Sequence, residues 1–223
     1  MTRTDEFALI ETLFAPLATD AAALGLKDDA ALWSAAGEGV IAKDMLVEGV
    51  HFRSADPLDR VARKALRVNL SDLAAMGATP AGYLLGLALP DRLLDRDALG
   101  PFADGLAEDQ AAYGLSLIGG DTTRTPGPLV VSITMTGRLD GRRPLRRGGA
   151  LVGDDVYVSG TIGDAGLGLR AFEGAPDGLA REHVACLKDR YQLPEPRLGL
   201  GEALCGVASA AADVSDGLLS DAG

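Results

Sequence analysis

The sequence lacks the cysteine pairs and long apolar runs that define several large protein classes. Its two cysteines, Cys186 and Cys205, have no CxxC spacing, which excludes a disulfide framework and a zinc site. The longest apolar runs, residues 83–89 and 129–135, are too short to span a bilayer. The N-terminus lacks the hydrophobic core of a signal peptide. We therefore expect a cytoplasmic protein with no membrane partner.

Basic residues are too few for a nucleic-acid surface. The formal net charge is −11, whereas nucleic-acid binding requires clustered Lys and Arg. The sequence contains no GxxxxGK[ST] P-loop, and the glycine-rich residues 163–168 do not match GxGxxG, so we expect them to serve packing or helix entry. No Ser-His-Asp order or Cys-His pair indicates covalent catalysis. The acidic excess suits solubility, and acids gathered in one cleft would require cations to offset their repulsion.

Alternating helix and strand signals predict an α/β fold of the α+β type. The 223 residues, 47% of them hydrophobic, are enough for a substantial core. Helices are predicted from residue 4, over 56–76 and 97–113, near 169, after Pro196 and from 216. Strands are predicted over 40–42, 83–89, 115–118, 129–139, 156–159 and 210–214. The basic stretch 141–150 is interpreted as a junction between a domain at 1–140 and part of a second at 141–223. Because the sequence ends in the first turn of a predicted helix, we expect it to be truncated.

A set of aspartates stands where predicted strands or helices end. These are Asp28, Asp29, Asp44, Asp72, Asp121, Asp213 and Asp216. Carboxylates are hard oxygen ligands suited to Mg²⁺, and several Mg²⁺ ions can neutralise a polyphosphate. Any single Asp suits a turn or a helix cap equally well.

Three further features favour phosphate chemistry. Residues 119–123 (GGDTT) offer backbone amides, a carboxylate and two hydroxyls after a predicted strand, which predicts a loop that cradles phosphate. His51, in EGVHF, could contact a substrate phosphate or ring, or be an ordinary core or surface histidine. Arg147 could reach a nucleotide phosphate with its planar fork, or be a solvated linker charge.

Taken together, these motifs resemble those of thiamine-monophosphate kinases. KDDAA, KDMLVEGVHF, NLSDLAAMGATP, LIGGDTTR, RxGA…GDDVYVSGTIGDA and DVSDGLLSD occur in the family's order and cover nearly the whole chain. Several are shared with a wider superfamily that includes aminoimidazole ribonucleotide synthetase and selenophosphate synthetase. EGVHF together with GGDTTR favours the thiamine-monophosphate member.

The resemblance implies an N-terminal α/β domain whose sheet forms a barrel with that of a second subunit, so that the protein is a homodimer. A C-terminal α/β domain would close over the active site. The implied reaction transfers a phosphoryl group from ATP directly to thiamine monophosphate, with several Mg²⁺ ions. The implied magnesium ligands are Asp29, Asp44, Asp72, Asp121, Asp213 and Asp216, the implied nucleotide-binding residues are Gly120, Asp121, Arg147 and Ser215, and His51 is the implied substrate contact.

The sequence departs from the family pattern at two places. Lys27-Asp28-Asp29 replaces the common GDD, which leaves the role of Asp28 open. Ala42 and Lys43 replace two hydroxyl residues before Asp44, so Lys43 could place its ammonium where a metal would sit, or could bind phosphate. The family's later acidic and aromatic residues, which contact the thiamine, lie beyond the sequence.

Two alternatives remain open. One is another ATP-dependent enzyme of the superfamily, although no reactive cysteine stands near the N-terminus as the selenophosphate type would require. The other is a non-catalytic module that binds metal or nucleotide. Calcium binding has no support, because the D-x-[DN]-x-[DN]-G loop is absent.

Overall fold

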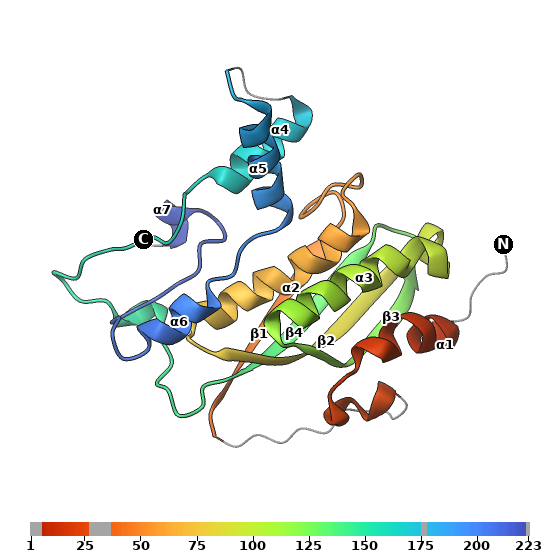
Figure 1. Cartoon of the computed structure of the whole chain (residues 1–223), viewed down its shortest axis with the longest axis horizontal. Helices are drawn as coiled ribbons and strands as arrows, with labels where there is room; N and C mark the ends of the chain where they lie inside the picture. Colours follow the sequence, from red (N-terminus) through yellow and green to blue (C-terminus); the bar gives the residue numbers. More distant parts are fainter. Residues whose placement is uncertain (1–5, 27–36, 175–177, 222–223) are drawn as a thin grey trace.

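A single mixed sheet organises the first part of the chain. The computed structural model describes residues 6–26, 37–174 and 178–221. Among these, four strands pair in the order β1-β4-β2-β3: β1 (Gly39–Val47), β2 (Thr79–Pro90), β3 (Ser116–Thr125) and β4 (Val130–Arg138) (Figure 1). Strand β4 runs antiparallel to β1 and β2, and β3 runs parallel to β2. The mixed α/β fold expected from the sequence is confirmed.

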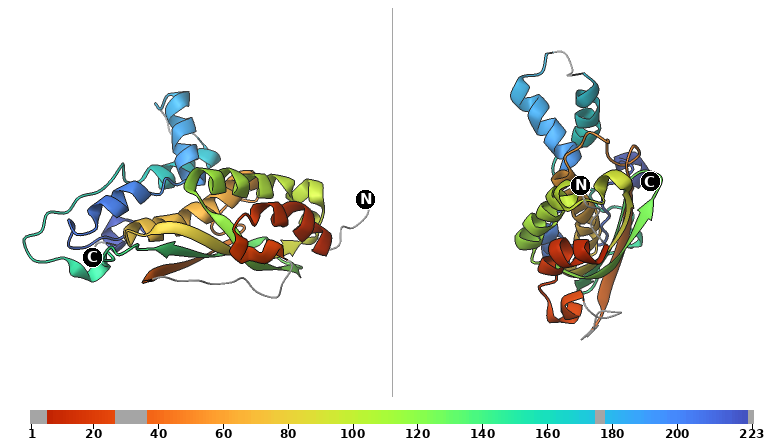
Figure 2. Two further views of the ribbon diagram at one scale, coloured as in Figure 1. Left: turned by 60° about the horizontal axis from the view of Figure 1, so that its bottom comes forward. Right: turned by 90° about the vertical axis from the view of Figure 1, so that its right-hand side faces the viewer.

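Two long helices cover one face of this sheet. They are α2 (Leu58–Ala75) and α3 (Arg96–Tyr113), and Figure 2 shows them side by side on the same side of the strands. The remaining helices are α1 (Glu6–Leu9), α4 (Asp164–Glu173), α5 (Arg181–Gln192), α6 (Leu198–Leu204) and α7 (Leu218–Asp221). Short π and 3₁₀ turns span Ile10–Phe14, Ala15–Leu17, Ala21–Leu26, Asp91–Leu93 and Arg147–Gly149.

Local sequence explains the bounds of α3. The Asp95 side chain caps its start by accepting a hydrogen bond from the Asp97 N–H at 2.8 Å. Gly114 ends it at a φ of +67°, a conformation that glycine adopts without steric cost. The helix predicted over 97–113 is therefore confirmed. It begins one residue earlier than predicted, at Arg96, after its cap at Asp95.

The core lies between the sheet and α2 and α3. Along β2, alternate residues (Tyr83, Leu85, Leu87 and Leu89) are buried beneath the helices, as the two-residue period of a strand dictates. The opposite face carries no helix of the described chain (Figure 2). Large apolar side chains project from it, with Ile41 70%, Met45 51% and Leu84 41% exposed.

The later part of the chain packs against α2 through helices. The α4–α5 hairpin stands over the N-terminal end of α2, and α6 lies against its C-terminal end (Figure 1). Gly201 of α6 approaches so closely that a Cβ would lie 2.0 Å from the Ala74 carbonyl oxygen. Within the described residues, no helix has both the length and the apolarity needed to cross a membrane.

Several local predictions are wrong. Residues 156–159 and 210–214 are not strands: no described strand pairs with them, so their backbone stays irregular. Helix α5 was not predicted, because its sequence is largely polar. The helix predicted over 56–76 begins later, at Leu58, and the Asp56 carboxylate pairs with Arg53 and accepts a hydrogen bond from Gln192. The N-terminal helix breaks after α1 into π and 3₁₀ turns.

The GGDTT segment is also not a loop. Residues 119–123 lie inside β3 and pair with β2. A Cβ on Gly120 would lie 2.0 Å from the Leu85 carbonyl oxygen, so glycine is required there for the two strands to approach.

Candidate active site

Two of the expected metal ligands meet between β1 and α2. Asp44 shares its row of the sheet with Ile133 and Leu85, so it faces the helix-covered side. Asp72 projects from the last turns of α2 toward the same place. The two carboxyl groups are near enough for each to influence the pKa of the other. The packing of α2 on β1 therefore brings together residues that are 28 positions apart.

A third aspartate reaches the same place from the end of the chain. Asp213 lies beside Asp72 on the wall of a cleft of about 270 Å³ between β1, the end of α2 and residues 211–213. Arg147 also lines this cleft, and its guanidinium donates to the Asp213 carboxylate at 3.1 Å. The Asp213 side chain is 13% exposed and that of Arg147 is 62% exposed, so the arginine fork remains open to solvent.

The acids repel one another. Burial, with the charges of Asp44 and Asp213, raises the pKa of Asp72 from 3.8 to about 6, while Arg147 opposes the shift. Burial and then Asp213 raise the pKa of Asp44. The proximity of the two carboxyl groups therefore disfavours the state in which both are ionised.

The donor set fits a hard divalent cation. Within the described part of the chain, no three His, Cys, Asp or Glu side chains converge closely enough to hold an ion by themselves. Mg²⁺ does not require such a cage, because it usually keeps several waters and binds one or two carboxylates plus substrate phosphates. A cluster whose mutual repulsion raises a carboxyl pKa has the charge that such an ion would neutralise.

His51 lies in the tight turn that follows β1. The Val47 N–H donates to His51 Nδ1 at 3.0 Å, so the proton of the neutral ring is on Nε2. The ring is exposed, and it lies near enough to Asp44 to influence the pKa of that carboxyl. A donor N–H is therefore available to a ligand beside the acid cluster.

Asp121 is not brought to this cluster within one chain. It stands on β3 at the opposite edge of the sheet, in a row with Gly86, Ser132 and Met45 on the open face. Three strand spacings separate it from β1, which is roughly 14 Å. Lys43 also belongs to the open face, where its ammonium donates to Ser132 Oγ, so it does not occupy the cleft where a metal would sit.

The remaining candidates are placed differently. The backbone N–H groups of Ser215, Asp216 and Gly217 all donate to the Asp221 carboxylate, at 2.9–3.1 Å. Asp216 is exposed and does not line the cleft. Asp28 and Asp29 lie outside the described residues.

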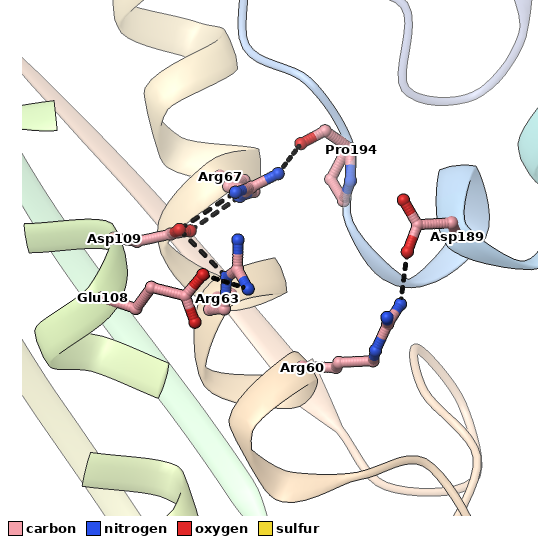
Figure 3. A network of polar contacts seen from close by, with 7 residues as sticks. All are labelled: Arg60, Arg63, Arg67, Glu108, Asp109, Asp189 and Pro194. Carbon is pink, nitrogen blue, oxygen red and sulfur yellow. Dashed lines mark hydrogen bonds and ion pairs between the residues drawn. The ribbon is translucent and has the colours of Figure 1, made fainter. Parts of the chain in front are cut away.

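A network that the sequence did not reveal fixes the helix carrying Asp72. Asp109 on α3 is fully buried and accepts hydrogen bonds from Arg63 Nε at 3.0 Å and from Arg67 at 2.6 and 2.9 Å (Figure 3). Arg67 also donates to the Pro194 carbonyl oxygen at 3.3 Å, which ties α2 to the segment after α5. An isolated Asp on an amphipathic helix gives no sequence signal for such a role.

Comparisons with known proteins identify relatives along most of the chain. Residues 27–139 match the family described as AIR synthase related protein, N-terminal domain. The chain is 49% identical over 219 residues to thiamine-monophosphate kinase of Caulobacter vibrioides, covering 97% of this chain and 61% of that protein. It is 44% identical over 203 residues to the Escherichia coli (strain K12) thiamine-monophosphate kinase, covering 90% and 61% respectively.

Solved structures give the same picture. The thiamine-monophosphate kinase of Stenotrophomonas maltophilia K279a superposes with a TM-score of 0.82 at 43% identity, over 98% of this chain and 70% of that one. A complex described as AaThiL with AMPPCP and TMP superposes with a TM-score of 0.77 at 29% identity, over 100% and 70%. The chain spans 61% of the length of the first two relatives.

Proposed function

The chain belongs to the thiamine-monophosphate kinase family, and on that premise we propose that the protein transfers the γ-phosphoryl group of ATP to thiamine monophosphate with the help of Mg²⁺. The observation that carries the proposal is that Asp72, Asp213 and Arg147 line one cleft, with Asp44 close enough to influence both acids. The relative solved with AMPPCP and TMP supports the choice of co-substrates.

The proposed reaction is a direct displacement. An oxygen of the thiamine phosphate group forms a bond to the γ-phosphorus of ATP. The bond from that phosphorus to the bridging oxygen breaks, and ADP leaves with the electron pair. We assign no general base, because the attacking oxygen is already ionised at neutral pH. Positioning and charge neutralisation are then the main demands on the protein.

Each residue of the cleft has a role in this scheme. Asp44, Asp72 and Asp213 would hold Mg²⁺, which when bound supplies positive charge to the phosphates. Arg147 would present its fork to a nucleotide phosphate, and His51 Nε2–H would donate to the phosphate of the acceptor. Asp29, Asp216, Gly120 and Ser215 are proposed to complete the metal and nucleotide sites on the strength of the family motifs alone.

We propose further that the protein acts as a homodimer paired through the open face of the sheet. The exposed Ile41, Met45 and Leu84 form an apolar surface there, and such surfaces mark interfaces. Asp121 stands on the same face, far from Asp44 in its own chain. In a two-fold dimer its carboxylate would serve the cleft of the other copy.

Mixing two inactive variants tests this shared site. Asp121→Asn and Asp72→Asn would each be inactive alone. After joint refolding, half of the dimers would be mixed, and each mixed dimer would carry one intact site, so about one quarter of wild-type turnover should return. If no activity returns although mixed dimers form, Asp121 acts within its own chain.

The proposed reaction is tested first by binding. We expect a non-hydrolysable ATP analogue to bind only with Mg²⁺ present in isothermal titration calorimetry. Asp213→Asn should weaken that binding by at least about tenfold, the effect of one charge-assisted contact. The control Asp91→Asn alters an exposed ion pair with Arg124, away from the cleft, and should bind as the wild type does.

Turnover is the second test. In the natural full-length protein, ADP release should depend on thiamine monophosphate. Mg²⁺-dependent nucleotide binding without such turnover would refute the kinase and favour a nucleotide-binding module. Tight binding that is independent of Mg²⁺ would refute the proposed role of the acid cluster.

A further inference from the structure

The turn that carries His51 is held by its own backbone. The Gly49 N–H donates to the Phe52 carbonyl oxygen at 2.8 Å, and the His51 N–H donates to that of Val47 at 2.9 Å. With the bond from the Val47 N–H to Nδ1, His51 is tied to Val47 both through its backbone and through its imidazole ring. The outward direction of Nε2 therefore depends on where the whole turn is held.

One side chain outside the turn holds it from α2. Lys64 Nζ donates to the His51 carbonyl oxygen at 2.8 Å. The same ammonium lies 4.0 Å from the centroid of the Tyr191 ring on α5, a distance at which a cation and an aromatic face attract. Lys64 thus contacts the His51 turn and the α4–α5 hairpin at once.

The hairpin is braced against the same loop by a second stack. Arg53, two residues after His51, places its guanidinium 3.4 Å from the Phe172 ring centroid on α4. Phe172 and Tyr191 meet edge to face, with 5.9 Å between their centroids. Lys188 also lies over Phe172, at 4.7 Å, but it contacts the hairpin alone.

A lysine at this position costs stability. Burial lowers the pKa of Lys64 from 10.5 to about 8, while the nearby Asp56 carboxylate acts in the opposite direction. The Tyr191 ring also faces this ammonium, and the Asp56 carboxylate is itself paired with Arg53. An apolar side chain of similar length would avoid that burial penalty, so a retained cation points to a role other than stability.

We propose that Lys64 is a positioning residue: it fixes the His51 turn against the α4–α5 hairpin so that the imidazole Nε2–H meets the phosphate of the acceptor. The inference rests on the proposed function, in which His51 contacts a small phosphate monoester. It adds that the affinity for this acceptor is set from a distance by a contact between the two halves of the chain. Nucleotide binding, which uses the cleft on the other side of Asp44, does not depend on it.

The test compares Lys64→Met with Lys188→Met in the natural full-length protein. Both changes remove a lysine cation from the same aromatic pair, but Lys188 makes no bond to the turn. Hydrogen exchange of the 48–52 amides and ¹⁵N spectra of the histidine rings report on the turn without any substrate. The chain has only two histidines, so the His51 ring signals are readily assigned.

For Lys64→Met we expect turn amides that exchange about tenfold faster and a His51 ring that no longer keeps one tautomer. The dissociation constant for thiamine monophosphate should rise about tenfold, the loss expected for one charge-assisted contact. The dissociation constant for the ATP analogue should not rise, and the melting temperature should not fall. Lys188→Met should match the wild type, and Lys64→Arg should recover most of the acceptor affinity.

Two results would overturn the inference. One is a Lys64→Met protein whose exchange and ring spectra equal those of Lys188→Met. The other is an equal loss of acceptor and nucleotide affinity, which indicates general damage. If Lys64→Met does not fold, Lys64→Gln is read by the same criteria. Failure of the wild type to bind thiamine monophosphate would refute the proposed function, whereas the substrate-free spectra would still decide whether Lys64 positions His51.

Discussion

Replacing Asp72 by asparagine should stabilise the metal-free protein. Burial, together with the charges of Asp44 and Asp213, disfavours the ionised form of Asp72 and raises the pKa of its carboxyl from 3.8 to about 6. The difference is about two pKa units, which at about 1.4 kcal/mol each gives an upper limit near 3 kcal/mol. Asp72 is only half-buried, and solvent screening reduces the expected gain to about 1 kcal/mol.

The pH dependence gives this prediction its sign. In the folded protein Asp72 binds its proton more tightly than in the unfolded chain. The repulsive penalty is thus present in full above about pH 6 and is lost as the pH falls through 6 toward 4. Asp72→Asn should exceed the wild type by about 1 kcal/mol at pH 7.5 and match it near pH 4.

Urea unfolding of both proteins in a chelator measures the difference directly. At this chain length about 1 kcal/mol corresponds to roughly 2–4 °C in melting temperature. Mg²⁺ should then reverse the order, because an ion bound to the folded state stabilises it by about 2.7 kcal/mol at 100 times its dissociation constant. A metal-free Asp72→Asn protein that is less stable than the wild type at pH 7.5, or a difference that ignores pH, would refute the proposed repulsion.

Three further predictions follow from the packing. Asp109→Asn should lower stability by about 3 kcal/mol, because it removes the buried carboxylate that pairs with Arg63 and Arg67, and of these two only Arg63 keeps another acidic partner among the described residues, Glu108. Asp91→Asn, in an exposed pair, should cost less than 1 kcal/mol by the same urea measurement. Gly120→Ala should lower the free energy of unfolding by about 2 kcal/mol or more, since its Cβ would collide with the β2 backbone. Gly100 on α3 is the control, because a Cβ there meets nothing within 4 Å. Gly100→Ala should be neutral or stabilising in thermal unfolding. Ile41→Glu should convert the proposed dimer to monomer in sedimentation, because it buries a charge in the open face.

Each of these has a contrary outcome. Equal losses for Asp109→Asn and Asp91→Asn would show that the buried network adds nothing to stability. Gly120 and Gly100 variants of equal stability would contradict the close strand contact. Val50→Glu, in the turn after β1 and equally exposed, is the control for Ile41→Glu, and dissociation by both would place the interface elsewhere.

The sequence predicted the elements whose signal is local. The strand at 129–139 alternates apolar and polar residues, and the helix at 97–113 has its own cap and terminal glycine. The segments at 156–159 and 210–214 are also rich in apolar residues but did not form strands, because a strand requires a partner to receive its hydrogen bonds. No local pattern supplies that partner. The polar α5 went unpredicted because its stability comes from its packing against α4.

The residues of the candidate site also differ in how well the sequence predicted them. Asp44, Asp72 and Asp213 were each singled out at the ends of predicted elements and by the family motifs, and the fold places them together. Asp121 was predicted with equal reason and lies on the far edge of the sheet, because the strand order β1-β4-β2-β3 cannot be deduced from the chain order. Lys64 was missed because a lysine on an amphipathic helix is ordinarily a solvated charge, and its contact with His51 exists only in the folded turn.

The position of the core within the sequence bears on how the chain folds during its synthesis. The buried cluster beneath α2 and α3 is drawn from residues between Leu9 and Leu139, so it can close while the remainder is still being synthesised. Asp44 and Asp72 are then already opposed, without the arginine or the third acid. Arg147 and Asp213 arrive later, so that a nascent chain can form the folded scaffold before the proposed ion and nucleotide site is complete.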